Sequence, residues 1–75
     1  MFKQGDIVED PAFGIMGVLL ESFMATNKIT GKPKLSWKML VMANNFGYDK
    51  SQAGDIVVFG DKYLKDNYNL VVDND

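Results

Sequence analysis

The sequence predicts a small all-β domain of five short antiparallel strands, and three observations lead to that fold class. Apolar and polar residues alternate with period two in short segments, glycine or proline interrupts the apolar runs, and no segment shows an amphipathic helix of about ten or more residues. The chain has 75 residues, of which 47% are hydrophobic, so it can bury one core but not two. We therefore expect a single domain over residues 1–75.

The first strand is predicted at Asp6–Glu9, where apolar and polar residues alternate briefly. A loop should follow, because Pro11 cannot donate to a strand ladder and Gly14 can adopt a left-handed conformation. We expect Phe13, the bulky residue of this loop, to fold back toward the core.

The second strand is predicted at Ile15–Met24, the longest apolar run of the chain. Leucine and methionine would also suit a helix, but Gly17 favours a strand. A glycine inside a helix costs about 1 kcal/mol relative to alanine, whereas inside a strand it commonly marks a bulge or a bend.

A long polar hairpin connection is predicted over residues 25–36, since this segment contains Asn27, Gly31 and Pro33. The third strand should then run from Leu35 to Met42 with period-two alternation. One face would carry Leu35, Trp37, Met39 and Val41, and the other Ser36, Lys38, Leu40 and Met42.

The C-terminal third contributes the remaining elements. A glycine-containing and asparagine-containing loop precedes the fourth strand, which is predicted at Asp55–Phe59. Residues 61–68 can form a single helical turn capped by Asp61, and Asn69–Val72 is the predicted last strand.

These elements together predict a small, strongly bent antiparallel barrel of five strands, with one short helical turn before the last strand. The closest architecture is SH3-like. A small OB-fold barrel is the structural rival, although it usually needs longer strands, and a ferredoxin-like fold would need longer amphipathic helices.

The tetrapeptide GDIV occurs twice, at Gly5–Val8 and at Gly54–Val57. A tandem repeat should extend beyond four residues, but the flanking sequences do not align. Gly-Asp suits the end of a turn and Ile-Val suits the beginning of a strand, so the pair predicts two strand starts of the same local design.

Composition excludes several function classes. The chain has no cysteine, histidine or arginine, and its net charge is -2. Without histidine and cysteine, catalysis and metal binding would rest on carboxylates that stand in loop and turn contexts. Calcium is conceivable at Asp61 or in the segment 66–75, but the spacing matches no calcium loop. We therefore expect no enzyme activity, no cofactor and no metal site.

The longest uninterrupted apolar stretch, Ile15–Leu20 with Gly17 included, is far shorter than the roughly 20 residues that span a membrane. The N-terminus also lacks the basic and apolar regions of a secretory signal. The expected location is the cytoplasm of a host cell, or a virion assembled there, with no membrane partner.

The segment Phe2–Glu21 resembles the opening of the CarD-like RNA polymerase-interacting domain, and "WKMLVM" is similar to the third strand of that family. The plan of Gly-Asp, apolar strand, and Gly-Ile-x-Gly-Val also resembles short SH3-like barrels encoded by tailed phages. The first resemblance implies a Tudor-like barrel that contacts RNA polymerase, and the second a phage protein. The matching residues are Phe2, Gly5, Asp6, Val8, Pro11, Phe13, Gly14, Ile15 and Gly17.

The predicted function is a non-enzymatic protein-binding or structural module, such as a phage accessory or virion protein that forms a homo-oligomer or docks on a larger assembly. The chain offers more large apolar residues than a tiny core should absorb, although any of them could instead close a second minicore under the loops. The candidate partner-binding residues are Phe23, Met24, Leu40, Met42, Phe46, Tyr48 and Phe59.

Two alternatives remain. One is a regulator that contacts RNA polymerase, as the resemblance implies. The other is a single-stranded nucleic-acid binder, in which lysines around the hairpin act together with the aromatic residues. Because the chain is acidic overall and lacks arginine, we do not expect nucleic acid to be the principal partner. The lysines concerned are Lys28, Lys32, Lys34 and Lys38.

Overall fold

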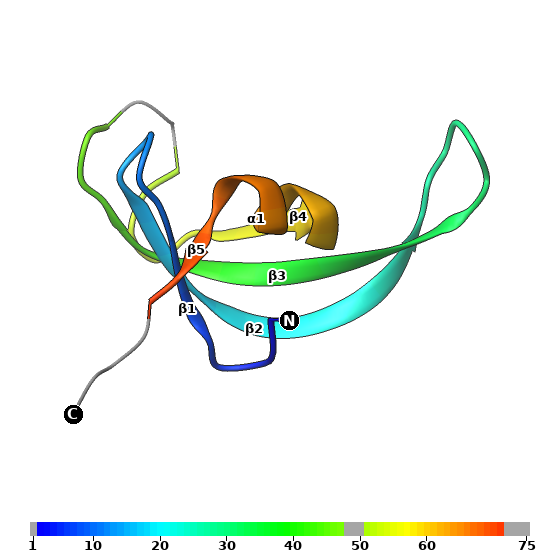
Figure 1. Cartoon of the computed structure of the whole chain (residues 1–75), viewed down its shortest axis with the longest axis horizontal. Helices are drawn as coiled ribbons and strands as arrows, with labels where there is room; N and C mark the ends of the chain where they lie inside the picture. Colours follow the sequence, from blue (N-terminus) through cyan, green and yellow to red (C-terminus); the bar gives the residue numbers. More distant parts are fainter. Residues whose placement is uncertain (1, 48–50, 72–75) are drawn as a thin grey trace.

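The protein is a five-stranded antiparallel sheet with one short helix before the last strand (Figure 1). The computed structural model describes residues 2–47 and 51–71, and the strand order is β4-β3-β2-β1-β5. The predicted fold class is confirmed in these respects, whereas a relationship to SH3-like proteins stays a prediction. The elements are β1 (Ile7–Asp10), β2 (Ile15–Thr26), β3 (Pro33–Asn44), β4 (Ile56–Gly60), α1 (Asp61–Asn67) and β5 (Asn69–Leu70).

The hairpin between β2 and β3 is longer than predicted, and the connection is correspondingly shorter. Strand pairing continues to Thr26 opposite Pro33, so only residues 27–32 form the turn. The Asn27 side chain organises this turn, because its Oδ1 accepts the backbone N–H groups of Ile29 and Thr30 at 2.8 and 3.1 Å. The prediction of a long polar loop over 25–36 is therefore wrong: the paired strands occupy half of this segment.

The core lies on one face of the sheet, which we call the inner face. Along β3, Trp37, Met39 and Val41 are buried as the period-two pattern predicted, and burial also alternates along the first half of β2. Leu35 is instead 39% exposed, because the outer end of the hairpin extends beyond the core, and Ser36, predicted for the other face, is 4% exposed. Helix α1 contributes Leu64 and packs beside β3 and β4 (Figure 1). The buried hydrophobic residues are Val8, Ile15, Leu19, Trp37, Met39, Val41, Leu64 and Tyr68.

Each of the two GDIV copies forms its own turn, and the two turns have the same geometry. In the first, the Lys3 N–H donates to Asp6 Oδ2 at 2.9 Å, and Gly5 has φ of 89°. In the second, the Gln52 N–H donates to Asp55 Oδ2 at 2.8 Å, and Gly54 has φ of 97°.

Each Gly-Asp pair is also hydrogen-bonded to the neighbouring strand in the same way. Gly5 donates to the Leu19 carbonyl and Leu19 donates to the Asp6 carbonyl; Gly54 and Asp55 repeat this pattern with Val41. The prediction of two strand starts with one local design is confirmed, because a positive-φ glycine and an aspartate side chain close both turns.

Gly17 lies where the backbone of β2 packs tightly against β3. A Cβ atom at this position would stand 2.6 Å from Met39 Cγ and 2.8 Å from the Leu40 carbonyl oxygen. The β2–β3 register shifts beside it, between Met16 and Gly17, and shifts again between Leu19 and Glu21. The predicted strand irregularity at Gly17 is confirmed, and such shifts increase the local bend and twist of a sheet.

The turn between β1 and β2 is built around Asp10, which is 3% exposed. Its Oδ1 accepts the Ala12 N–H at 2.9 Å, its carbonyl accepts the Gly14 N–H at 2.8 Å, and Gly14 has φ of 70°. Phe13 is 46% exposed, so the prediction that it folds into the core is wrong. The tight turn holds this side chain at the surface.

Candidate interaction surfaces

The sheet face opposite the core carries a continuous apolar row across four strands. The register places Ile7 opposite Val18, Val18 opposite Leu40, and Leu40 opposite Ile56. Directly opposed residues of an antiparallel pair point to the same face of the sheet. The row therefore crosses β1, β2, β3 and β4 without a polar residue.

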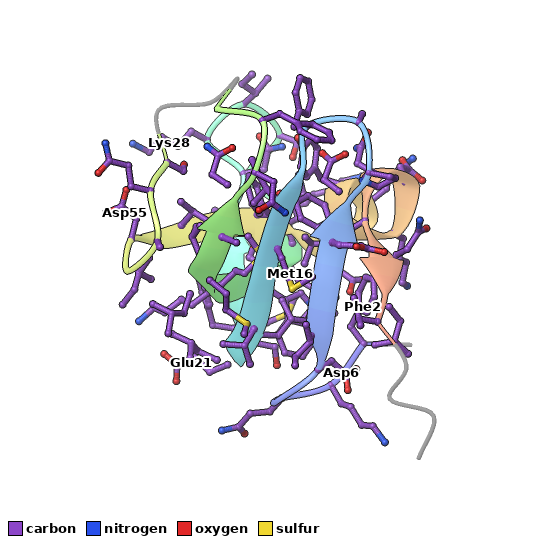
Figure 2. The ribbon with its side chains drawn as sticks, turned by 90° about the vertical axis from the view of Figure 1, so that its left-hand side faces the viewer. Phe2, Asp6, Met16, Glu21, Lys28 and Asp55 are labelled. Atoms are coloured by element: carbon purple, nitrogen blue, oxygen red, sulfur yellow. The ribbon has the colours of Figure 1, made fainter. Side chains whose placement is uncertain are left out.

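Further apolar side chains extend this row on both sides. Val58 follows Ile56 on β4 at the alternate position. Met16, labelled in Figure 2, precedes Val18 on β2 at the alternate position. Met42 is the extra residue of β3 at the register shift. Ile56, Val58 and Met42 are 61%, 53% and 47% exposed. We call the set Ile7, Met16, Val18, Leu40, Met42, Ile56 and Val58 the outer face.

Charged residues border the outer face. Lys38, opposite Val58, binds Glu21 at 3.0 Å, and both side chains are about half exposed. Glu9 stands opposite Met16 at the other end of the face. Lys34 lies on the same side of β3, where its aliphatic chain covers Gly60. Within residues 2–47 and 51–71, these two lysines and two glutamates thus give a border with no net charge.

The structure brings three of the predicted partner-binding residues to this side of the sheet. Leu40 and Met42 belong to the outer face, and Phe23 lies at its border, with its ring centroid 6.0 Å from Lys38 Nζ. Met24 is as exposed as Ile56, at 61%, but it stands opposite Leu35 and therefore points to the other side of the hairpin.

The other predicted partner-binding residues do not join this set. Phe46 lies in the loop after β3, with its ring over Gly14. Phe59 packs partly buried against the core, with its ring centroid 4.9 Å from that of Tyr63 and 5.7 Å from that of Tyr68. Phe59 therefore belongs to the margin of the main core, and not to a second minicore under the loops. Tyr48 lies outside the described residues.

Sequence reasoning missed most of the outer face. The sequence predicts a strand that contains Ile56 and Val58 but does not mark them as candidate partner-binding residues. Met16, Val18 and Ile7 likewise stand in predicted strands without any feature that marks them as surface residues. Alternation in "DIVVF" shows that Ile56 and Val58 share a face. Which residues of β1, β2 and β3 stand beside them depends on the pairing register, and the register shifts obscure it.

Among the predicted nucleic-acid lysines, Lys38 lies over the Phe23 ring, but no lysine joins Trp37 or Phe46 in a stacking surface. Lys28 and Lys32 lie at the hairpin turn, which is at the opposite end of the molecule from the loop after β3 (Figure 1). Lys34 and Lys38 point away from Trp37, because they occupy alternate positions of the same strand. Trp37 is itself only 5% exposed, so its ring offers no stacking surface for a base.

A second surface is a shallow groove of about 440 Å³ over Trp37. Its floor is the Trp37 indole, whose Nε1–H donates to Asp61 Oδ1 at 3.0 Å. Asp61 Oδ2 also binds Lys65 Nζ at 2.9 Å. The segment before β1, the strands β2 and β3, and the helix α1 all contribute residues to the groove. The lining residues are Phe2, Lys3, Gln4, Glu21, Ser22, Leu35, Trp37, Asp61 and Lys65.

Asp61 has a structural role in this groove. It is the first residue of α1, whereas the N-cap is Gly60, so the prediction of a cap at Asp61 is wrong. The hydrogen bond from Lys65 holds the pKa of Asp61 below its ordinary value of 3.8; burial opposes this shift, and the Trp37 hydrogen bond adds to it. A carboxyl group that stays ionised in this way is not suited to general acid catalysis near neutral pH.

Comparisons with protein-family models, with curated proteins and with solved structures find no match for this chain. Within residues 2–47 and 51–71, no helix has the length and apolar character to cross a membrane. In the same part of the chain, no three carboxylate side chains gather in a way that could hold a metal ion.

Proposed function

We propose that this protein is a non-enzymatic protein-contact or structural module, and that its contact surface is the outer face. The observation that carries the proposal is the apolar row from Ile7 to Ile56, flanked by side chains that are about half exposed. Contiguous apolar patches of several hundred Å² on small proteins commonly mark interaction sites. Methionine among them suits such a surface because its side chain adapts to a partner.

The chemistry of the groove supports a non-enzymatic role. Its buried polar groups are used within the fold, since Asp61 accepts from both Trp37 and Lys65. Among the described residues, no buried side-chain nitrogen or oxygen lacks a hydrogen-bond partner. Within the described residues, the groove therefore holds no buried polar side-chain group that is left without a partner.

The likeness to short phage-encoded barrels supports a place for this module in a larger assembly. The RNA polymerase alternative rests on the segment Phe2–Glu21. Much of that segment has a structural explanation, since Asp10 and Gly14 close the β1–β2 turn. Retention on immobilised purified RNA polymerase at low salt tests the alternative, and no retention would remove it.

Photo-cross-linking tests the proposed surface. A photoreactive residue at Met42 should give cross-links to protein in an extract of the native cell. The same residue at Met24, which is at least as exposed but lies on the other side of the hairpin, should give few. Cross-links of equal yield from both positions, or none from position 42, would contradict the assignment.

A further inference from the structure

We propose that the outer face is the interface between two copies of this chain, packed sheet against sheet about a two-fold axis. This inference rests on the proposed function and names the partner. Two sheets that pack face to face lie about 10 Å apart, with their strands within about 30° of each other. An isologous contact would place the apolar row of one copy on the same row of its partner.

The size of the surface agrees with a small dimer interface. Three side chains near half exposure and four half-buried neighbours form an apolar patch on the order of several hundred Å². The charged border adds to the area that a second sheet would cover. A standard interface covers ~800 Å² per partner, which is about a seventh of the 5336 Å² exposed here.

The charges of the border permit self-association. The whole chain is negatively charged, with a net charge of -2, and two copies would repel each other weakly. Among the residues that the structure describes, however, the border of the outer face is neutral, because Lys34 and Lys38 balance Glu9 and Glu21.

Lys38 and Glu9 also stand at opposite ends of the apolar row, since one pairs beside Val58 and the other beside Met16. A two-fold rotation that exchanges these ends brings the Lys38–Glu21 ion pair of each copy to the end where Glu9 of the other copy stands. Each Lys38 can then lie between Glu21 of its own copy and Glu9 of its partner, and the symmetry forms this contact twice.

The core of this chain is small, so burying further apolar surface in a dimer would add to its stability. Eight buried hydrophobic residues make up the core among the described residues, and the chain has no cysteine for a disulfide. Domains of this size often gain stability from oligomerisation, because one core leaves little margin over conformational entropy. Covering the outer face would give each sheet an apolar layer on both sides.

Light scattering after gel filtration, from micromolar to near-millimolar full-length protein, tests the proposal. The mass should rise to that of two chains. Ile56→Lys should raise the dissociation constant at least about tenfold, because a charge would enter an apolar interface. Met24→Lys makes the same charge change at a site of equal exposure and should leave the dissociation constant unchanged. Met42→Lys is the second outer-face variant, should Ile56→Lys not fold.

Three results would overturn the proposal. The first is the mass of one chain throughout the concentration range. The second is a dimer that Met24→Lys disrupts and that neither outer-face variant affects. The third is a dimer in which the β4 backbone amides gain protection from exchange while Met16 and Met42 stay open to oxidation, since that pattern indicates pairing along the strand edge. In each case, a cross-link from position 42 to another protein would leave the proposed function standing.

Discussion

The two faces of the sheet are made of similar residues and have opposite surroundings. On the inner face, Leu19 and Met39 are fully buried. On the outer face, Met42 follows the buried Val41 on β3 and Ile56 precedes the partly buried Val57 on β4, yet Met42 and Ile56 are 47% and 61% exposed. Strands that are apolar on both faces are typical of sheets covered on both sides. Within residues 2–47 and 51–71, only the inner face is covered, by α1 and the core, and the proposed contact surface rests on this difference.

The largest expected effect separates the two faces directly. Leu19→Ala removes a fully buried side chain and should lower the free energy of unfolding by about 2–5 kcal/mol. Val58→Ala, on the outer face, should change it by about 0.5 kcal/mol or less in dilute protein. Urea denaturation at low concentration measures both. Equal losses would show that the monomer itself covers the outer face.

Gly17→Ala tests how closely the two long strands pack. A Cβ at position 17 would meet the Leu40 carbonyl at 2.8 Å and the buried Met39 side chain at 2.6 Å. The backbone cannot yield as a flexible side chain could, so we expect a loss of about 1–3 kcal/mol. Ser22→Ala, an exposed position of the same strand, serves as the control in the same denaturation experiment. A stable Gly17→Ala protein would mean that the register can relax.

Gly54→Ala tests the turn that starts β4, the strand with the most exposed part of the outer face. Nothing lies within 4 Å of a Cβ at this position, but φ is 97°. The cost is therefore conformational, about 1–2 kcal/mol. Gly5→Ala should cost a similar amount, because the first GDIV turn has the same geometry. Thermal denaturation of both variants checks the equivalence, and a large difference between them would refute it.

Asp61→Asn should weaken the attachment of α1 to the inner face by about 1 kcal/mol at neutral pH, because it removes the ionic hydrogen bond with Lys65 and keeps an acceptor for Trp37. The pKa of Asp61 is lower in the folded protein than its ordinary value of 3.8. The contribution of the ionised Asp61 to stability is therefore complete above pH 3.8, and it is lost as the pH falls through the pKa of Asp61 in the folded protein.

The difference in stability between wild type and Asp61→Asn should accordingly shrink in acid below 3.8. Chemical denaturation at neutral and acidic pH measures it. A difference that stays constant or grows in acid would show that Asp61 is not held ionised by Lys65.

The smallest effect is expected at Lys62, on the solvent side of α1. Lys62 binds Asp66 at 2.7 Å, and this hydrogen bond raises the pKa of Lys62, but the lysine side chain is 83% exposed. Exposed ion pairs contribute little to stability. Lys62→Ala should therefore leave the melting temperature unchanged, whereas Lys65→Ala should lower it, because its partner Asp61 is 14% exposed. Equal melting temperatures for the two variants would contradict this.

Much of the fold could be predicted because its signals are local. The two GDIV turns, the strand at Gly17 and the alternation of Trp37, Met39 and Val41 depend on neighbours in the chain, and the structure confirms them. The length of the β2–β3 hairpin could not be predicted in this way. Its lysines, threonine and proline suit a loop, but pairing between the two strands satisfies their backbone groups up to Thr26 and Pro33.

The candidate surface was only partly predictable. Leu40 and Met42 were candidates because period-two alternation places them on the face of β3 that points away from the core. Phe59 was included with them, although it packs against Tyr63 and the core. A single strand does not show which aromatic residue a following helix will cover.

Local chemistry along the chain was sufficient for the strand starts, the tight turns and the inward-facing residues of β3, because φ preferences and side-chain periodicity act between near neighbours. The outer face exists only in the folded sheet. Ile7, Val18, Leu40 and Ile56 are far apart in sequence, and the register of three strand pairs brings them into one row. That register depends on the close approach at Gly17 and on which face the core buries, and both are properties of the tertiary structure.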